Sequence, residues 1–135
     1  MVKKIFVNLS VQNLKVTLDF FGKLGFTFNR QFTNENAAAM IIGENMFVML
    51  LQKDFFKTFV KKEVADSTKT TEVITALEVG SKKEVDELVE KAAAAGGTIP
   101  HETKDLGFMY QRNFEDPDGH LWEIFWMDPS YVHKA

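Results

Sequence analysis

The stretch FEDPDGHLWEIFW, residues 114–126, carries the strongest fold signal in the chain. Its DPDG segment is a tight-turn sequence, because proline presets φ and Gly119 accepts the positive φ that such a turn needs. The flanking residues are therefore predicted to form two paired strands. Within the second strand, Glu123 is a lone carboxylate among apolar neighbours. A strand that is apolar on both faces is usually covered on both, so Glu123 is predicted to point either into a core or into a pocket.

Length and composition predict one globular domain over residues 1–135. The chain is 45% hydrophobic and 13% aromatic, which suffices for a substantial core. The longest apolar runs, at 37–42 and 46–51, are far shorter than the roughly 20 residues that cross a bilayer. The first residues alternate like a strand and lack the continuous apolar core of a signal peptide. Together with the absence of cysteine, this favours a cytoplasmic protein without a membrane partner.

The charge distribution argues against a nucleic-acid partner. The chain has 16 basic and 19 acidic residues and a net charge of -3. Its lysines are scattered among acids and form no basic stripe of the kind that binds phosphates. The most basic segment, FFKTFVKKE at 55–63, is interpreted as a solvated helix flank.

A first structural module is predicted over about residues 1–62. Residues 3–11 alternate apolar and polar side chains like a strand. Apolar residues at helical spacing follow, Leu14, Leu18, Phe21 and Leu24, with Asn13 as N-cap and Gly25 as the stop. Three further strands are predicted at 26–32, 36–43 and 45–53, separated by turn sequences. The order of elements is βαβββ.

The same order repeats over about residues 72–128, after a linker at 63–71. A strand at 73–79 precedes a helix at 81–97, which Ser81 and Glu84 begin with a capping box and Gly96 ends. Strands at 97–102, 107–115 and 120–126 complete the second βαβββ, and residues 129–135 are a tail. The sequence thus predicts an α+β fold of two βαβββ modules, which form a curved mixed sheet around a cleft.

Three motifs resemble a known family: Leu-x-Val before the first helix, FGKLGF at its end, and FEDPDGHLWE near the carboxyl terminus. This pattern is similar to the vicinal oxygen chelate (VOC) superfamily of glyoxalases, extradiol dioxygenases and bleomycin-resistance proteins. The resemblance spans residues 1–128 and implies a glyoxalase/bleomycin-resistance-like fold. It also implies a homodimer, to which the aromatic tail at 126–135 would contribute.

Metal-dependent members of that superfamily take one ligand from each of four strands, typically His and Glu in each module. The resemblance places these four positions at Phe6, Met49, Ile74 and Glu123. Carbon side chains offer no lone pair, and a thioether is a poor ligand for hard or borderline ions. A register error of one or two residues would bring in Asn8 or Thr75, but no histidine. No metal site and no cofactor are therefore expected.

The three histidines are interpreted as surface residues. His101 follows Pro100 at a strand end, His120 lies at the edge of the hairpin, and His133 lies in the tail. His120 and Glu123 are three residues apart, so in a strand they face opposite sides and cannot share an ion.

The resemblance implies a ligand pocket with Glu123 as the candidate catalytic or contact residue. An apolar and aromatic lining suits a small hydrophobic or aromatic molecule. The alternative role for Glu123 is a structural tether, paired with Arg30, Arg112 or Asn8. The residues predicted to line the pocket are Phe6, Asn8, Met49, Ile74, Met109, Tyr110, Arg112, Glu123 and Phe125.

Three functions remain open from the sequence. The first is metal-free sequestration of a small molecule, as in bleomycin-resistance proteins, with Glu123 contacting a basic group. The second is a glyoxalase-type lyase or isomerase, or a dioxygenase-like enzyme, whose divalent metal is bound in another way. The third is a catalytically silent dimer scaffold. The missing ligands favour the first, and whether the protein is an enzyme stays open.

Overall fold

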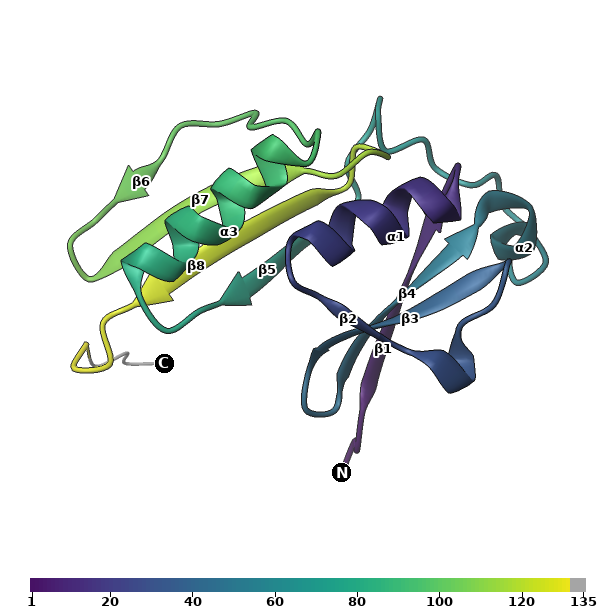
Figure 1. The fold of residues 1–135 in the computed structure, drawn as a ribbon, viewed down its shortest axis with the longest axis horizontal. Helices are drawn as coiled ribbons and strands as arrows, with labels where there is room; N and C mark the ends of the chain where they lie inside the picture. Colours follow the sequence, from purple (N-terminus) through teal and green to yellow (C-terminus); the bar gives the residue numbers. More distant parts are fainter. Residues whose placement is uncertain (132–135) are drawn as a thin grey trace. The chain divides into compact units, whose positions relative to one another are not determined.

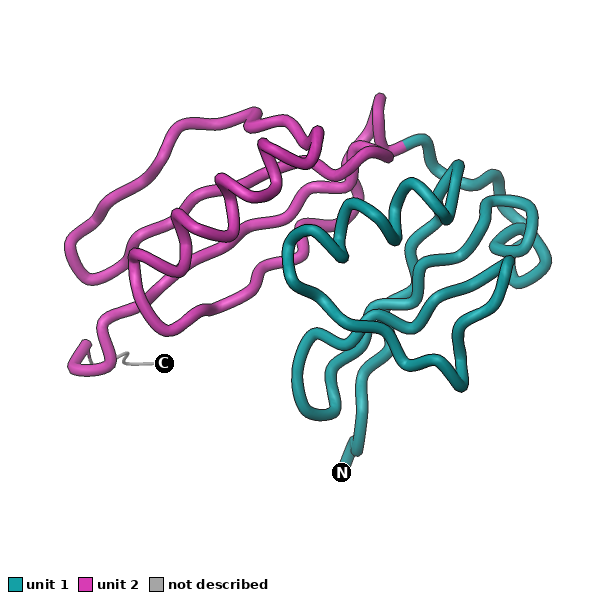
Figure 2. The backbone as a smooth tube through the Cα atoms, viewed as in Figure 1, with its two compact units in different colours: residues 1–66 teal, residues 67–135 magenta. Residues whose placement is uncertain are grey.

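The structure, a computed structural model, describes residues 1–131 and divides into two compact units, Met1–Asp66 and Ser67–Ala135 (Figure 2). The division falls inside the linker predicted at 63–71. Each unit has its own four-stranded sheet. The α+β class and the two modules are confirmed, with strand pairing contained in each module. His133 and the end of the predicted tail lie outside the described residues.

Unit 1 contains a mixed sheet in the order β1-β4-β3-β2, in which β1 and β4 are parallel and the other pairs antiparallel (Figure 1). Its elements are β1 (Ile5–Val11), α1 (Leu14–Lys23), β2 (Thr27–Asn29), the 3-10 helix η1 (Arg30–Phe32), β3 (Ala37–Gly43), β4 (Met46–Gln52) and α2 (Lys53–Lys57).

Helix α1 begins and ends where the sequence predicts. The Asn13 side chain accepts a hydrogen bond from the backbone N–H of Val16 at 3.3 Å, and Gly25 ends the helix with φ of +99°. The buried residues of the helix are Leu14, Thr17, Phe20 and Phe21. Leu18, predicted as part of the apolar face, is only half-buried, because the buried stripe is centred one residue away from it.

Unit 2 repeats the arrangement in the order β5-β8-β7-β6, and α3 lies across one face of its sheet (Figure 1). Its elements are β5 (Ile74–Glu78), α3 (Lys82–Ala94), β6 (Lys104–Asp105), β7 (Met109–Glu115) and β8 (Leu121–Met127). Strands β5 and β8 are parallel, and the other pairs are antiparallel. The core between α3 and the sheet includes Val85, Val89, Trp122 and Ile124, all fully buried.

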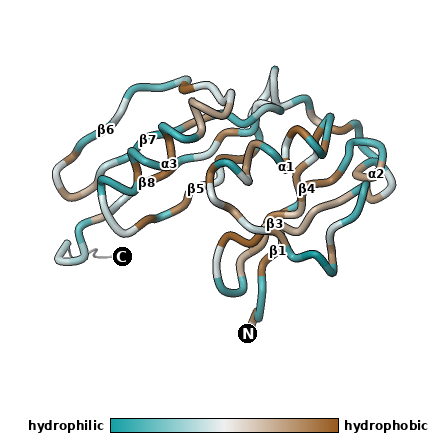
Figure 3. Tube along the Cα trace, viewed as in Figure 1, coloured by the Kyte–Doolittle hydropathy of each residue, from teal (hydrophilic) through white to brown (hydrophobic). Residues whose placement is uncertain are grey.

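Helix α3 is amphipathic, as its alternation of brown and teal in Figure 3 shows. Only one of the two hydrogen bonds of the predicted capping box forms between Ser81 and Glu84. The Ser81 hydroxyl accepts a hydrogen bond from the N–H of Glu84 at 3.1 Å, but the Glu84 carboxylate accepts from Gly80 instead of Ser81. Both polar groups still satisfy free N–H groups at the helix start. Among residues 1–131, no helix is both long and apolar enough to cross a membrane.

The prediction of a strand at 97–102 is wrong. That segment makes a single bridge, between Thr98 and Glu115, and the edge strand β6 forms later, at Lys104–Asp105. Pro100 has no N–H to donate to a neighbouring strand, so it interrupts the ladder. Residues 99–103 are left as a loop beside the sheet.

Side chains of β7 hold α3 against the sheet. Arg112 forms ion pairs with Asp86 at 3.1 Å and with Glu90 at 2.8 Å, both on α3. The Tyr110 hydroxyl donates a hydrogen bond to Asp86 at 2.7 Å, which raises the pKa of the tyrosine. Lys82, the first residue of α3, lies 5.8 Å from the centre of the Tyr110 ring. These contacts hold α3 to β7 at several points along the helix.

Replacing Arg112 by alanine is expected to lower the free energy of unfolding by about 2 kcal/mol. The Arg112 side chain is only 14% exposed, so its two ion pairs are less screened than ordinary surface pairs. Urea unfolding followed by circular dichroism measures the change. Lys83→Ala is the matched control, because its pair with Glu87 joins side chains that are 85% and 53% exposed. Equal effects of the two substitutions would contradict the expectation.

The DPDG turn is built around Asp116, which is buried and only 5% exposed. Its carboxylate accepts hydrogen bonds from the backbone N–H of Asp118 at 2.9 Å, from that of His120 at 3.1 Å, and from the Trp122 indole at 3.0 Å. Gly119 has φ of +84°, as predicted for this turn. The turn also meets the start of unit 2, since a Cβ at Gly119 would lie 2.6 Å from the carbonyl oxygen of Ser67.

Candidate functional site

The two faces of β8 have different surroundings. Trp122 and Ile124 point toward α3 and are fully buried. Leu121, Glu123 and Phe125 point to the opposite face and are half-buried. The face of β8 toward α3 is therefore the more deeply buried of the two. Of the two positions predicted for Glu123, the structure shows the pocket and not the core.

The pocket lies on this open face of the unit 2 sheet and has a volume of about 450 Å³. Strands β5, β8 and β7 supply its floor, and the segment before and at β6 supplies a wall. The residues that line it are Ile74, His101, Glu102, Thr103, Lys104, Gln111, Asn113, Leu121 and Glu123.

The wall is tied to the floor by Asn113. This side chain, 6% exposed, accepts a hydrogen bond from the backbone N–H of His101 at 3.3 Å. The wall brings His101, Glu102 and Lys104 to a pocket that the sequence predicts to be an apolar floor with one acid. The pocket is therefore more polar than predicted. Sequence reasoning missed these wall residues because nothing in the pattern of residues 101–104 points to a pocket.

Glu123 is held by the side-chain amide of Gln111, whose Nε2 donates a hydrogen bond to Oε1 of the carboxylate. Of the partners proposed from sequence, Arg112 pairs with Asp86 and Glu90 of α3 instead, and Arg30 and Asn8 belong to unit 1. A usable signal was present, because the DPDG turn sets the register of the hairpin. In that register Asn113 is opposite Glu123 and Gln111 is opposite Phe125, which makes Gln111 a diagonal neighbour of Glu123.

Two of the predicted pocket residues lie on the other face of the sheet. Tyr110 and Arg112 point toward α3, where both bond to Asp86, and neither lines the pocket. Side chains alternate between the two faces along β7, so Gln111 and Asn113 lie on the same face as Glu123, and Tyr110 and Arg112 lie on the other. Met109 and Phe125 share that face but lie outside the pocket lining.

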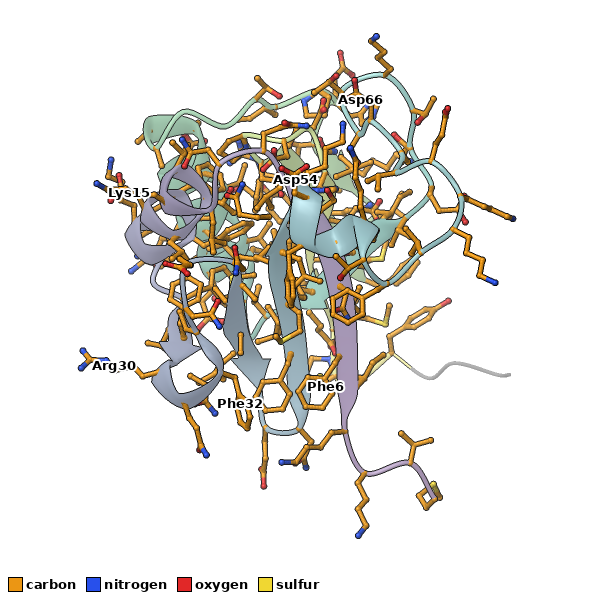
Figure 4. All side chains as sticks on the ribbon, turned by 90° about the vertical axis from the view of Figure 1, so that its right-hand side faces the viewer. Phe6, Lys15, Arg30, Phe32, Asp54 and Asp66 are labelled. Carbon is orange, nitrogen blue, oxygen red and sulfur yellow. The ribbon has the colours of Figure 1, made fainter. Side chains whose placement is uncertain are left out.

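The remaining predicted residues, Phe6, Asn8 and Met49, belong to the unit 1 sheet. Phe6, a residue of β1, is 50% exposed, and its ring is stacked on that of Phe47 with centroids 4.9 Å apart (Figure 4). Asn8 is paired in register with Met49 and donates a hydrogen bond to the backbone oxygen of Phe6 at 3.3 Å. All three lie on the sheet face opposite Leu9 and Val11, which are buried.

Arg30, one of the partners proposed for Glu123, is exposed in η1 of unit 1. Its guanidinium points away from the strands of that unit (Figure 4).

The side chains at the four positions of the metal ligands do not fit a divalent ion. Phe6 and Ile74 have no donor atom, Met49 offers only a thioether, and Glu123 alone is a carboxylate. Within residues 1–131, no group of three or more His, Cys, Asp or Glu side chains is arranged to hold a metal. A carboxylate with an amide neighbour can instead accept and donate hydrogen bonds to an organic ligand.

Comparison with known proteins matches this geometry to solved structures of the same fold. The hypothetical protein SA1046 from S. aureus is 30% identical, with 93% of this chain and 94% of that chain covered and a TM-score of 0.80. A glyoxalase-related enzyme from Fulvimarina pelagi is 21% identical, with 99% and 94% covered and a TM-score of 0.80. TioX from Micromonospora sp. ML1 is 20% identical, with 93% and 99% covered and a TM-score of 0.69.

A comparison with proteins of curated function gives no match. The family described as the Glyoxalase/Bleomycin resistance protein/Dioxygenase superfamily matches residues 5–124, which run from the start of β1 into β8. The chain therefore belongs to the Glyoxalase/Bleomycin resistance protein/Dioxygenase superfamily, the VOC superfamily.

Proposed function

We propose that this protein binds a small organic molecule, without a metal ion, in the pocket around Glu123. The observation that carries the proposal is the carboxylate of Glu123, held by Gln111 on the floor of a pocket of about 450 Å³. Pockets of roughly 300–1,000 Å³ with a few placed polar groups are typical of small-molecule sites. The donor-poor side chains at the other three ligand positions support binding of an organic group in preference to an ion.

The lining suggests how such a molecule would lie. Ile74 and Leu121 are paired in register on adjacent strands and provide apolar surface beside Glu123. A flat apolar or aromatic body would rest on these two side chains, while a polar group of the ligand contacts the carboxylate. Sequestration of the bleomycin-resistance kind fits this arrangement, because it requires binding but no chemical step.

Binding is tested by screening a library of small aromatic compounds against the ¹⁵N-labelled protein by NMR. A compound that binds in the pocket is expected to shift the backbone amide signals of β7, β8 and residues 101–104. For such a compound, Glu123→Gln is expected to weaken affinity about tenfold, because a charge-assisted hydrogen bond is lost. Glu78→Gln, which removes an exposed acid of β5 outside the pocket, is expected to leave affinity unchanged. Hits that leave these signals unmoved would contradict the proposed site.

The metal-free part is tested separately by elemental analysis of the purified protein. We expect nickel, zinc, iron and manganese to be well below one ion per chain. A stoichiometric divalent metal that is lost in Glu123→Gln would overturn the proposal in favour of a glyoxalase-type lyase.

A further inference from the structure

We infer that the pocket selects ligands with a planar cationic donor group, such as an amidinium or a guanidinium, and that Gln111 determines this selectivity. The inference rests on the proposed function and adds the chemical class of the ligand. It follows from the hydrogen bonds, charges and apolar surface around Glu123.

Glu123 and Gln111 leave more acceptors than donors available to a ligand. The bond from Gln111 Nε2 to Glu123 Oε1 fixes the orientation of the amide. An ionised carboxylate only accepts hydrogen bonds, so the NH₂ group of the amide, and not its oxygen, must face Glu123. Neither Glu123 Oε2 nor Gln111 Oε1 accepts a hydrogen bond from any side chain or backbone group of residues 1–131. The pair offers a ligand two acceptors and only the second N–H of Gln111 as a donor, so a ligand rich in N–H groups fits best.

The charge of the pocket also favours a cation. No described cation forms an ion pair with Glu123, although Lys104 and His101 line the same pocket. The lining contains two acids, Glu102 and Glu123, and one lysine, Lys104, so its carboxylate and ammonium groups together leave a negative charge. A half-buried carboxylate without a cation is stabilised when a ligand brings the positive charge.

Gln111 determines the selectivity because its side chain is neutral. Its amide holds the carboxylate in place without neutralising it, whereas a lysine or arginine there would fill the role of the ligand's cation. Planar carboxylate and amide groups match planar donors, since two parallel hydrogen bonds can form at once. Ile74 and Leu121 lie beside Glu123 and would contact the attached apolar body.

The test is isothermal titration calorimetry with benzamidine, benzamide and benzoate, which share a ring and differ in the charge of one planar substituent. Wild-type protein is expected to bind benzamidine about tenfold more tightly than benzamide, with benzoate the weakest. Gln111→Lys is expected to abolish the preference for benzamidine, because the introduced ammonium group would pair with Glu123. Gln31→Lys adds the same charge at an exposed position of unit 1 and is expected to keep the preference.

The outcomes separate this inference from the proposed function. If the three compounds bind in the pocket with equal affinity, or benzoate binds best, the selectivity is refuted while the site stands. If benzamidine fails to bind at all, the inference is refuted, and the library screen decides the proposed function independently. Thermal unfolding confirms that each variant is folded. If Gln111→Lys does not fold, Glu123→Gln serves as the second variant and is also expected to lose the preference.

Discussion

Replacing Gly119 by alanine is expected to lower the free energy of unfolding by about 3 kcal/mol. Two costs combine. The backbone at Gly119 has φ of +84°, which is unfavourable by about 1 kcal/mol for a residue with a Cβ. The new Cβ would also lie 2.6 Å from the carbonyl oxygen of Ser67 and 3.0 Å from the Cα of Thr68, so backbone would have to move. In a chain of 135 residues we expect the melting temperature to fall by about 10 °C.

Gly96→Ala is the matched control for this substitution. Gly96 has a similar φ of +103°, but a Cβ there would meet nothing within 4 Å. Its cost is therefore the backbone term alone, about 1 kcal/mol. Differential scanning calorimetry of both variants measures the difference. If Gly96→Ala is as destabilising as Gly119→Ala, the close contact of the new Cβ with residues 67 and 68 does not lower stability, and the expectation is contradicted.

Local signals in the sequence are enough to predict most of the fold. Asn13, Ser81 and Gly25 act on neighbouring backbone groups, so their roles can be derived without knowing the tertiary structure. The wrong prediction at 97–102 has the opposite cause. The segment is predicted as a strand because it completes the second βαβββ, but whether it pairs depends on a neighbouring strand, and Pro100 has no N–H for that strand to accept.

The candidate site was less predictable, because its chemistry depends on pairs of residues from different strands. Glu123 was found as an acid in an apolar strand, but its partner Gln111 follows only from the hairpin register. Tyr110 and Arg112 were predicted to line the pocket, but side chains alternate along β7, so both lie on the face toward α3. The loop wall at 101–104 carries no pattern that points to a pocket.

Replacing Asp116 by alanine is expected to be the most destabilising of these changes, by about 4 kcal/mol at acidic pH. The substitution removes the acceptor of three hydrogen bonds, and one of the three donors is the indole of fully buried Trp122. Buried donors without an acceptor are costly because they have also lost water. Asp128→Ala is the control, since Asp128 accepts comparable bonds from the N–H and hydroxyl of Ser130 at the surface, where water replaces them. Urea unfolding should show little change for that variant.

The effect of Asp116→Ala is also expected to depend on pH. Burial raises the pKa of Asp116 above its usual 3.8, against the opposing influence of His120 and of the Trp122 indole. Between 3.8 and the raised pKa, the folded state binds more protons than the unfolded state, so the contribution of Asp116 to stability falls as pH rises. The stability gap between wild type and Asp116→Ala should therefore be larger at pH 4 than at pH 7. A gap that widens toward neutral pH would mean that the three hydrogen bonds to the carboxylate outweigh its burial.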